Sequence, residues 1–150
     1  MSSKPFLQEI WIIDAGGIVL YHQSLESRID PVLFGGIITA LNKVGEQIFK
    51  DYFQSIQIGQ YKYSIIHCSQ TDLLFIGLSN KDTKDEHVRK YLEKIHALFL
   101  QKYCGILTSW TGNLEIFKDL DQVISLKNDA ENWLGINLTK DLSRKVINQL

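Results

Sequence analysis

Near its amino terminus the chain reads Ile10-Trp11-Ile12-Ile13-Asp14-Ala15-Gly16-Gly17-Ile18-Val19-Leu20-Tyr21. Two runs of apolar, β-favouring residues flank a pair of glycines, and glycine accepts the positive φ angles that tight turns require. The pattern therefore predicts a β-hairpin with Gly16 and Gly17 in its turn. Because both runs are almost continuously apolar, we expect both faces of the hairpin to be covered.

Asp30-Pro31 marks the start of a helix, because aspartate is a favoured N-cap and proline is tolerated at the first helical position. Apolar residues then recur at spacings of three and four, which predicts one apolar helix face lying on a sheet. These residues are Leu33, Phe34, Ile37, Ile38, Leu41, Val44 and Ile48. Gly35 and Gly36 inside the helix indicate either a close approach of its backbone to the sheet or a kink.

Three further strands are expected at residues 53–58, 61–68 and 73–78, where β-favouring residues alternate or run together. The turns between them are short, so the strands should form an antiparallel meander. A long helix follows at residues 84–103, with Gly105 as its expected stop. Its apolar stripe comprises Val88, Tyr91, Leu92, Ile95, Leu98, Phe99 and Tyr103.

Shorter apolar patterns predict a helix near residues 114–124, an irregular cluster at 133–138 and a last helix at 139–150. The expected order is strand, strand, helix, three strands, then helices. This order predicts an α+β fold, with a five-stranded antiparallel sheet and helices on both of its faces. We expect one domain at 6–126 and a helical extension at 127–150 that packs on or flanks it.

Composition excludes several classes of protein. The chain has 150 residues and a formal net charge of −1, with no concentration of Lys and Arg, so a nucleic-acid binder is not expected. No window resembles a signal peptide or a membrane span, which predicts a cytoplasmic protein that reaches membranes only through partners. Cys68 and Cys104 are expected to be reduced core thiols rather than a disulfide.

A catalytic or metal site is not expected. His22, His67, His87 and His96 fall on different elements or at non-facing helical positions, so structural or surface roles are favoured over metal binding. The glycine pair precedes a strand and not a helix, which argues against a phosphate-binding loop. For Asp14 we expect a side-chain hydrogen bond that shapes the hairpin turn rather than acid catalysis. No cofactor is predicted.

In this order of elements the chain resembles the longin domain family. The hairpin at 10–21, the helical segment Asp30–Asp51 and the run Leu73-Leu74-Phe75-Ile76-Gly77 correspond to that family's first hairpin, first helix and fifth strand. The resemblance covers residues 6–126. It implies a non-catalytic interaction module of vesicle trafficking or small-GTPase regulation, which binds a small GTPase, a SNARE-like segment, another longin or roadblock subunit, or a second copy of itself. Because no sustained heptads follow the domain, SNARE activity itself is not expected.

An edge strand at 53–58 and a groove between it and the first helix are the expected binding surface, since an edge strand offers unpaired backbone groups to a partner. The candidate residues are Phe34, Ile38, Ile48, Gln54, Ile56, Gln57 and Ile58. Core packing is the competing role for Phe34, Ile38 and Ile48. Trp110 is a further candidate anchor, with packing over the sheet edge as its competing role.

A profilin-like domain that senses a small ligand is the alternative function. The ligand would lie between the sheet and the first helix, and Tyr61, Tyr63 and His67 would supply polar contacts.

Overall fold

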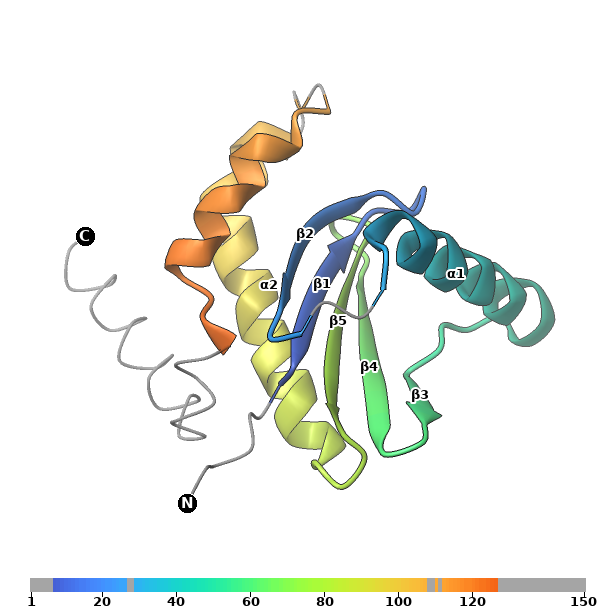
Figure 1. The fold of residues 1–150 in the computed structure, drawn as a ribbon. Helices are drawn as coiled ribbons and strands as arrows, with labels where there is room; N and C mark the ends of the chain where they lie inside the picture. Colours follow the sequence, from blue (N-terminus) through green and yellow to red (C-terminus); the bar gives the residue numbers. More distant parts are fainter. Residues whose placement is uncertain (1–6, 27–28, 108–109, 111, 127–150) are drawn as a thin grey trace, which may run out of the picture.

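The structure is a computed structural model that describes residues 7–26, 29–107, 110 and 112–126 (Figure 1). Its elements follow the predicted order. They are β1 (Glu9–Ile13), β2 (Val19–Ser24), α1 (Pro31–Val44), the π-helical turn η1 (Gly45–Phe49), β3 (Ser55–Ile58), β4 (Tyr61–Cys68), β5 (Leu73–Asn80), α2 (Asp85–Leu107) and the 3₁₀ helix η2 (Leu114–Gln122).

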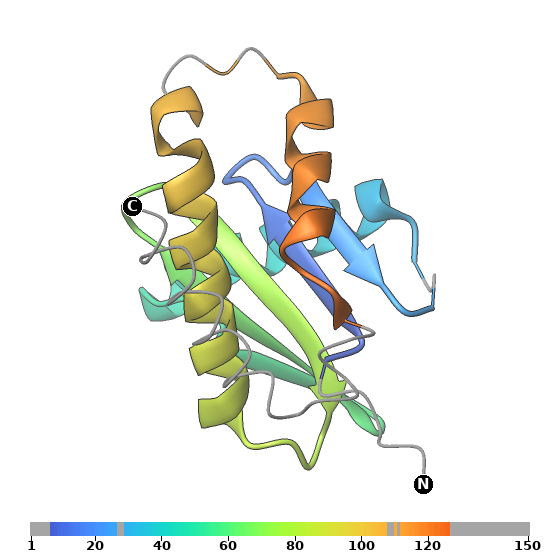
Figure 2. The same ribbon diagram turned by 90° about the vertical axis from the view of Figure 1, so that its left-hand side faces the viewer.

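The five strands form one antiparallel sheet in the order β2-β1-β5-β4-β3. Strands β1 and β5 are central and β2 and β3 are the edges, so the edge strand expected at 53–58 is confirmed as β3. Helix α1 covers one face of the sheet, whereas α2 and η2 lie side by side on the other (Figures 1 and 2). The α+β fold with helices on both faces, and the longin-type order of its elements, are confirmed.

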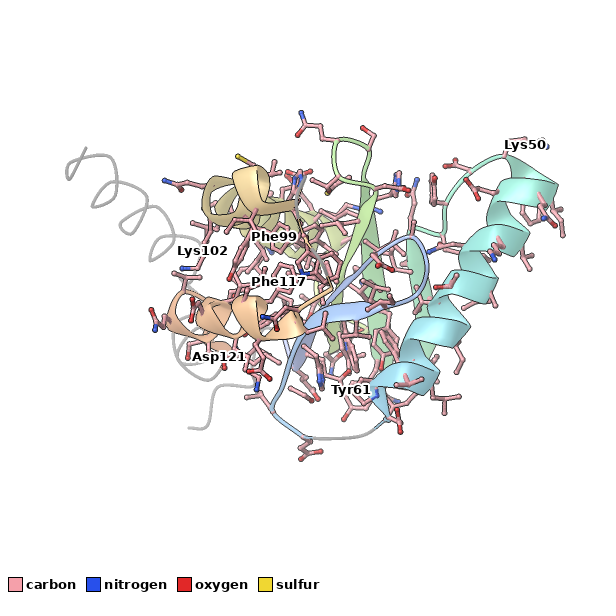
Figure 3. All side chains as sticks on the ribbon, turned by 90° about the horizontal axis from the view of Figure 1, so that it is seen from above. Lys50, Tyr61, Phe99, Lys102, Phe117 and Asp121 are labelled. Atoms are coloured by element: carbon pink, nitrogen blue, oxygen red, sulfur yellow. The ribbon has the colours of Figure 1, made fainter. Side chains whose placement is uncertain are left out.

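The sheet separates two apolar cores, visible in Figure 3 as side-chain layers on either side of the strands. On the α1 face, Trp11 and Ile76 are fully buried and Phe34 and Ile38 pack over them. On the α2 face, the rings of Phe99, Tyr103 and Phe117 lie 5.0–5.7 Å apart and join α2 to η2. Both faces of β1 are buried, but β2 is buried at only two of its six residues, so the expectation of full cover holds for the first strand alone.

The hairpin turn is held by Asp14, as predicted. Its Oδ1 accepts hydrogen bonds from the backbone N–H groups of Gly16 and Ile18, each at 2.9 Å. Gly17 adopts φ +91°, a left-handed backbone angle that residues other than glycine rarely take. One carboxylate thus satisfies two turn amides and fixes where β2 begins.

Helix α1 begins as predicted, with the Asp30 side chain accepting from the Val32 N–H at 2.8 Å. A Cβ on Gly35 would lie 2.1 Å from the carbonyl oxygen of Gly17, so this glycine permits a close approach to the hairpin turn. Gly36 is exposed and has open space around its Cβ position. The close-approach interpretation is therefore confirmed for Gly35 and wrong for Gly36.

The structure differs from the sequence predictions in three details of the helices and cysteines. Helix α2 runs through Gly105 to Leu107, because that glycine keeps helical geometry and has open space around it. Leu98 is only half-buried, at the margin of the buried stripe. Cys68 is buried as expected, but Cys104 is exposed, and both are free.

The predicted extension at 127–150, including the cluster at 133–138 and the last helix, lies outside the described residues. Within those residues, no helix is long and apolar enough to cross a membrane.

Candidate interaction surface

Helix α1 and η1 expose a line of large apolar side chains. Leu33, Ile37, Val44 and Ile48 are 57%, 45%, 44% and 66% exposed. Their spacings of four, seven and four residues place them on one side of a helix. We call these four residues the exposed stripe.

A second set of residues on α1 and η1, offset by one position from the exposed stripe, faces the sheet. Phe34, Ile38, Asn42 and Gly45 are buried, and their spacings of four, four and three are equally helical. Phe34 and Ile38, two of the predicted binding residues, therefore belong to the core and cannot contact a partner unless α1 lifts from the sheet.

Strand β3 borders the same side of the molecule and ends the sheet, since no described strand pairs with its outer side. Of the residues predicted to bind here, Gln54, Gln57 and Ile58 are exposed, whereas Ile56 is half-buried against the α1-side core. Ile58 exposes 61% of its surface. The edge therefore presents both free backbone groups and apolar side chains.

A shallow hollow of about 290 Å³ connects the end of α1 to the segment that leads into β3. Phe49 and Gly45 line it on the helical side, and Phe53 and Gln54 line it on the strand side. Phe49 is 71% exposed and extends the apolar surface beyond the exposed stripe. The stripe, the hollow and the β3 edge thus adjoin one another.

Trp110 lies apart from this surface. Its ring packs edge-on against Phe117 at 5.5 Å, and its Nε1 donates to the carbonyl of Asn113 at 3.0 Å. The side chain is half-buried against the α2-side core, so it is tied to η2 rather than folded over the sheet edge.

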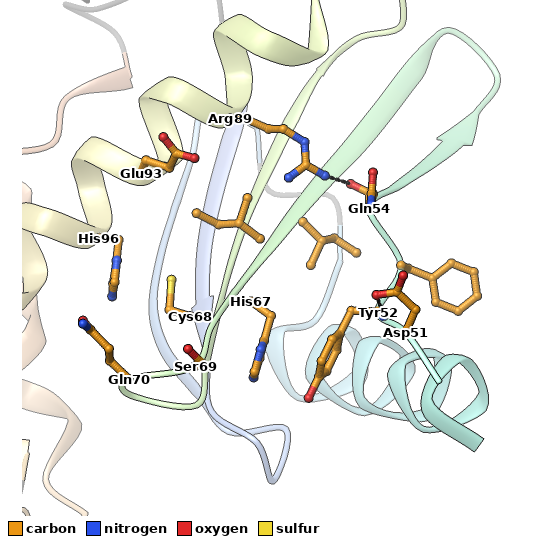
Figure 4. A pocket seen from close by; sticks show the side chains of 13 residues that line it. Asp51, Tyr52, Gln54, His67, Cys68, Ser69, Gln70, Arg89, Glu93 and His96 are labelled. Carbon is orange, nitrogen blue, oxygen red and sulfur yellow. Dashed lines mark hydrogen bonds between the residues drawn. The ribbon is translucent and has the colours of Figure 1, made fainter. Parts of the chain in front are cut away.

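A larger hollow of about 580 Å³ lies where β4 extends beyond β3 (Figure 4). Arg89, Glu93 and His96 line it from α2, and Arg89 points toward Gln54. Arg89 donates to the carbonyl of Gln54 at 3.4 Å. Burial, with Glu93 nearby, raises the pKa of the Cys68 thiol to about 11, and burial lowers the pKa of His96. A thiol with so high a pKa stays protonated at neutral pH, which does not suit a nucleophile.

His67 and His96 both line the larger hollow, but each histidine has a separate contact. His22 stacks on Trp11 with ring centroids 3.7 Å apart, and His96 meets Phe75 edge-on at 5.1 Å. The Nε2 of His67 lies 2.8 Å from Asp72 Oδ1. Among the described residues no cluster of histidine, cysteine and carboxylate side chains could hold a metal ion.

A smaller hollow of about 120 Å³ lies at the end of the sheet, between α1, the β1–β2 turn and the β4–β5 turn. Its lining residues are Ala15, Thr39, Asn42, Lys43, Glu46, Tyr52, His67, Asp72 and Leu74. The rings of Tyr52 and His67 stack at 4.1 Å and line both this hollow and the larger one. We call it the sheet-end hollow.

Asn42 in the sheet-end hollow was not singled out by the sequence. It is 8% exposed, and neither its Nδ2 nor its Oδ1 has a hydrogen-bond partner within the described part of the chain. A buried polar atom without a partner costs about 1–3 kcal/mol. The sequence did contain a signal for it, because Asn42 follows the apolar residues Phe34 and Ile38 at intervals of four along the helix.

The three polar residues expected to hold a ligand beneath α1 do not meet in one cavity. Tyr63 packs against Phe34, with its hydroxyl 3.3 Å from Glu9 Oε1, and Tyr61 is exposed at the start of β4. Of the three, His67 lines both the sheet-end hollow and the larger hollow. The space directly beneath α1 is filled by the α1-side core.

No protein-family model and no curated protein matches the sequence. Among solved structures, the chain is similar to Myxococcus xanthus MglB, with 11% identity and a TM-score of 0.47 over 63% of this chain and 85% of that one. A Roadblock/LC7 domain from Streptomyces avermitilis has 10% identity and a TM-score of 0.47, over 69% of this chain and 88% of that one. The mammalian SRP receptor has 19% identity and a TM-score of 0.49, over 85% of this chain and 96% of that one. At such identities a similar chain path does not carry function.

Proposed function

We propose that this longin-type domain is a non-catalytic protein-interaction module of vesicle trafficking or small-GTPase regulation. The observation that supports it is the exposed stripe on α1, which adjoins the open edge of β3. The partner classes that we propose are a small GTPase, a SNARE-like segment, another longin or roadblock subunit, or a second copy of the chain.

The exposed stripe supplies the apolar part of this surface. Contiguous apolar side chains on a protein surface mark sites that a partner covers. Each side chain of the stripe is about half exposed, so covering it contributes on the order of 1 kcal/mol. The stripe carries no charge of its own, which favours a partner with a matching apolar face.

The β3 edge supplies the hydrogen-bonding part of this surface, which orients the partner. A partner strand can hydrogen-bond to the outer backbone groups of β3, and this pairing fixes its orientation. Gln54 and Gln57 are exposed beside that edge and can hydrogen-bond to a partner's side chains, while Ile58 adds apolar contact. An apolar helix face beside a free strand edge can receive either a helix or an extended segment.

The test combines a disruptive variant with a matched one. Ile37→Glu with Ile48→Glu places two charges on the exposed stripe, and Gln101→Glu places one at an exposed position of α2 on the opposite side of the sheet. Binding of the purified chain to small GTPases, SNARE-like peptides and longin or roadblock domains would be measured by calorimetry. Self-association would be measured by light scattering.

We expect the double variant to weaken binding at least about tenfold, since burying two charges in an apolar contact is costly, and Gln101→Glu to leave it unchanged. If the wild-type chain binds none of these partners and stays monomeric, the proposal is wrong.

A further inference from the structure

The sheet-end hollow contains a polar group that the interaction surface does not use. Asn42 is more than nine-tenths buried, and its amide lacks partners for both the donor and the acceptor. An unpartnered buried amide is uncommon in folded proteins, where more than about 90% of buried polar groups are hydrogen-bonded. The same helix keeps apolar residues at the two preceding sheet-facing positions, Phe34 and Ile38. The asparagine is thus unfavourable for packing alone.

The walls of the hollow carry charges of both signs. Lys43 contributes an ammonium that has no ion pair with a described residue, and Glu46 and Asp72 contribute carboxylates. Glu46 accepts from the Tyr52 hydroxyl at 3.1 Å, and Asp72 contacts His67 at 2.8 Å. These contacts leave further lone pairs on both carboxylates, because each can accept several hydrogen bonds.

The volume limits the size of an occupant. An apolar cavity of about 150 Å³ holds a benzene molecule, so the 120 Å³ here suits a ligand of about five or six non-hydrogen atoms. Leu74 and Ala15 are the apolar lining, and the Asn42 amide can both donate and accept hydrogen bonds. A molecule of this size cannot fill the larger hollow, which is about 580 Å³.

The geometry points to a binding site for a small zwitterion of the amino-acid class in the sheet-end hollow. The ligand's carboxylate pairs with Lys43, and its ammonium pairs with Asp72 and Glu46. The Asn42 amide forms hydrogen bonds to the ligand, which supply the partners that the described residues do not. Such a ligand joins α1 to the β1–β2 and β4–β5 turns. This inference does not rest on the proposed protein-binding function.

The experiment uses the ¹⁵N-labelled chain and nuclear magnetic resonance. The probes are glycine and L-alanine, with propionate and ethylamine as matched compounds that each lack one charge. We expect saturable shifts of the Asn42 side-chain amide and of the backbone amides of Ala15 and Asp72. Half-saturation with the best amino acid should come at a concentration at least about tenfold lower than with either single-charge compound.

Two variants separate recognition from folding. Asn42→Leu replaces the amide with an apolar side chain of similar size, so the chain should stay folded and lose at least about tenfold in affinity. Lys43→Met is at an exposed position and should reduce the advantage of the amino acid over ethylamine. Binding to partners through the exposed stripe should be the same in both variants.

The absence of a saturable shift with both glycine and L-alanine up to about 10 mM would overturn the inference, because an affinity weaker than that corresponds to less than about 3 kcal/mol. An undiminished response from Asn42→Leu would also overturn it. A hollow that holds only water falls under the first of these outcomes.

Discussion

A Cβ atom on Gly35 would lie 2.1 Å from the carbonyl oxygen of Gly17, a distance that no real Cβ contact reaches. This contact joins the middle of α1 to the β1–β2 turn, and it sets how close the helix lies to the sheet. Gly36, the next residue along the helix, has nothing within 4 Å of its Cβ position. The two adjacent glycines therefore have opposite roles.

Gly35→Ala should destabilise the domain by about 1–3 kcal/mol, because α1 or the hairpin turn must move to admit the methyl group. Gly36→Ala is the matched control and should stabilise it by about 0.5–1 kcal/mol, since alanine loses less backbone entropy in a helix. Urea unfolding followed by circular dichroism would measure both. Equal effects of the two substitutions would contradict the close contact.

Asp14→Ala should remove both hydrogen bonds to the turn amides of Gly16 and Ile18 and cost about 1–3 kcal/mol in unfolding free energy. Asp14→Asn keeps an Oδ1 acceptor and should lose less than half as much. Urea titration of the three proteins compares them. A full loss in the asparagine variant would show that the negative charge, rather than the acceptor geometry, holds the turn.

Gln23 on β2 holds the segment that follows η2. Its Oε1 accepts from the Leu126 N–H, and its Nε2 donates to the carbonyl of Ile124, each at 2.8 Å. Gln23→Ala should raise the hydrogen-exchange rate of the Leu126 amide at least about tenfold, because one lost hydrogen bond is worth about 1–1.5 kcal/mol. Gln101→Ala on α2 is the control. An unchanged Leu126 rate would contradict this role of Gln23.

The two cysteines should react differently with iodoacetamide. Cys104 is exposed and should be alkylated at neutral pH, whereas Cys68 is buried and its pKa is raised to about 11. Alkylation of folded Cys68 should therefore accelerate only as the pH approaches 11. Mass spectrometry of the peptides would follow each site, with Cys104→Ser as the control. Equal rates at neutral pH would contradict the burial of Cys68.

Burial of Cys68 also links stability to pH. A folded pKa above the unfolded value of 9.0 means that the unfolded state ionises first. The contribution of the protonated Cys68 thiol to the free energy of unfolding is fully present below about pH 9 and is lost as the pH rises toward 11. In urea unfolding, Cys68→Ala should lose this part of the alkaline decline, and Cys104→Ser should keep it.

Much of the fold could be predicted because its signals are local. Gly16 and Gly17 mark a turn, and Asp14 sits where its carboxylate reaches the turn amides. Asp30-Pro31 starts a helix through capping chemistry that involves only neighbouring residues. The turns among β3, β4 and β5 are too short for anything but an antiparallel meander.

The candidate surface was predicted less completely, because α1 carries two apolar sets with the same helical period. Phe34 and Ile38 were candidates for the groove with core packing as the competing role, and they pack on Trp11 and the central strands. The sequence placed Leu33, Ile37, Val44 and Ile48 on the same sheet-facing side, and this was wrong, because all four are exposed. Periodicity gives the spacing of a face but not which face meets the sheet.

By itself, the sequence determined the order of strands and helices, the hairpin turn and the start of α1, since each depends on residues a few positions apart. Only the tertiary structure decided the rotation of α1 about its axis, because the contact of Gly35 with Gly17 brings together elements with no local signal for each other. That rotation leaves the exposed stripe in solvent and turns Asn42 into the sheet-end hollow. Both proposed sites therefore depend on how α1 is turned toward the sheet.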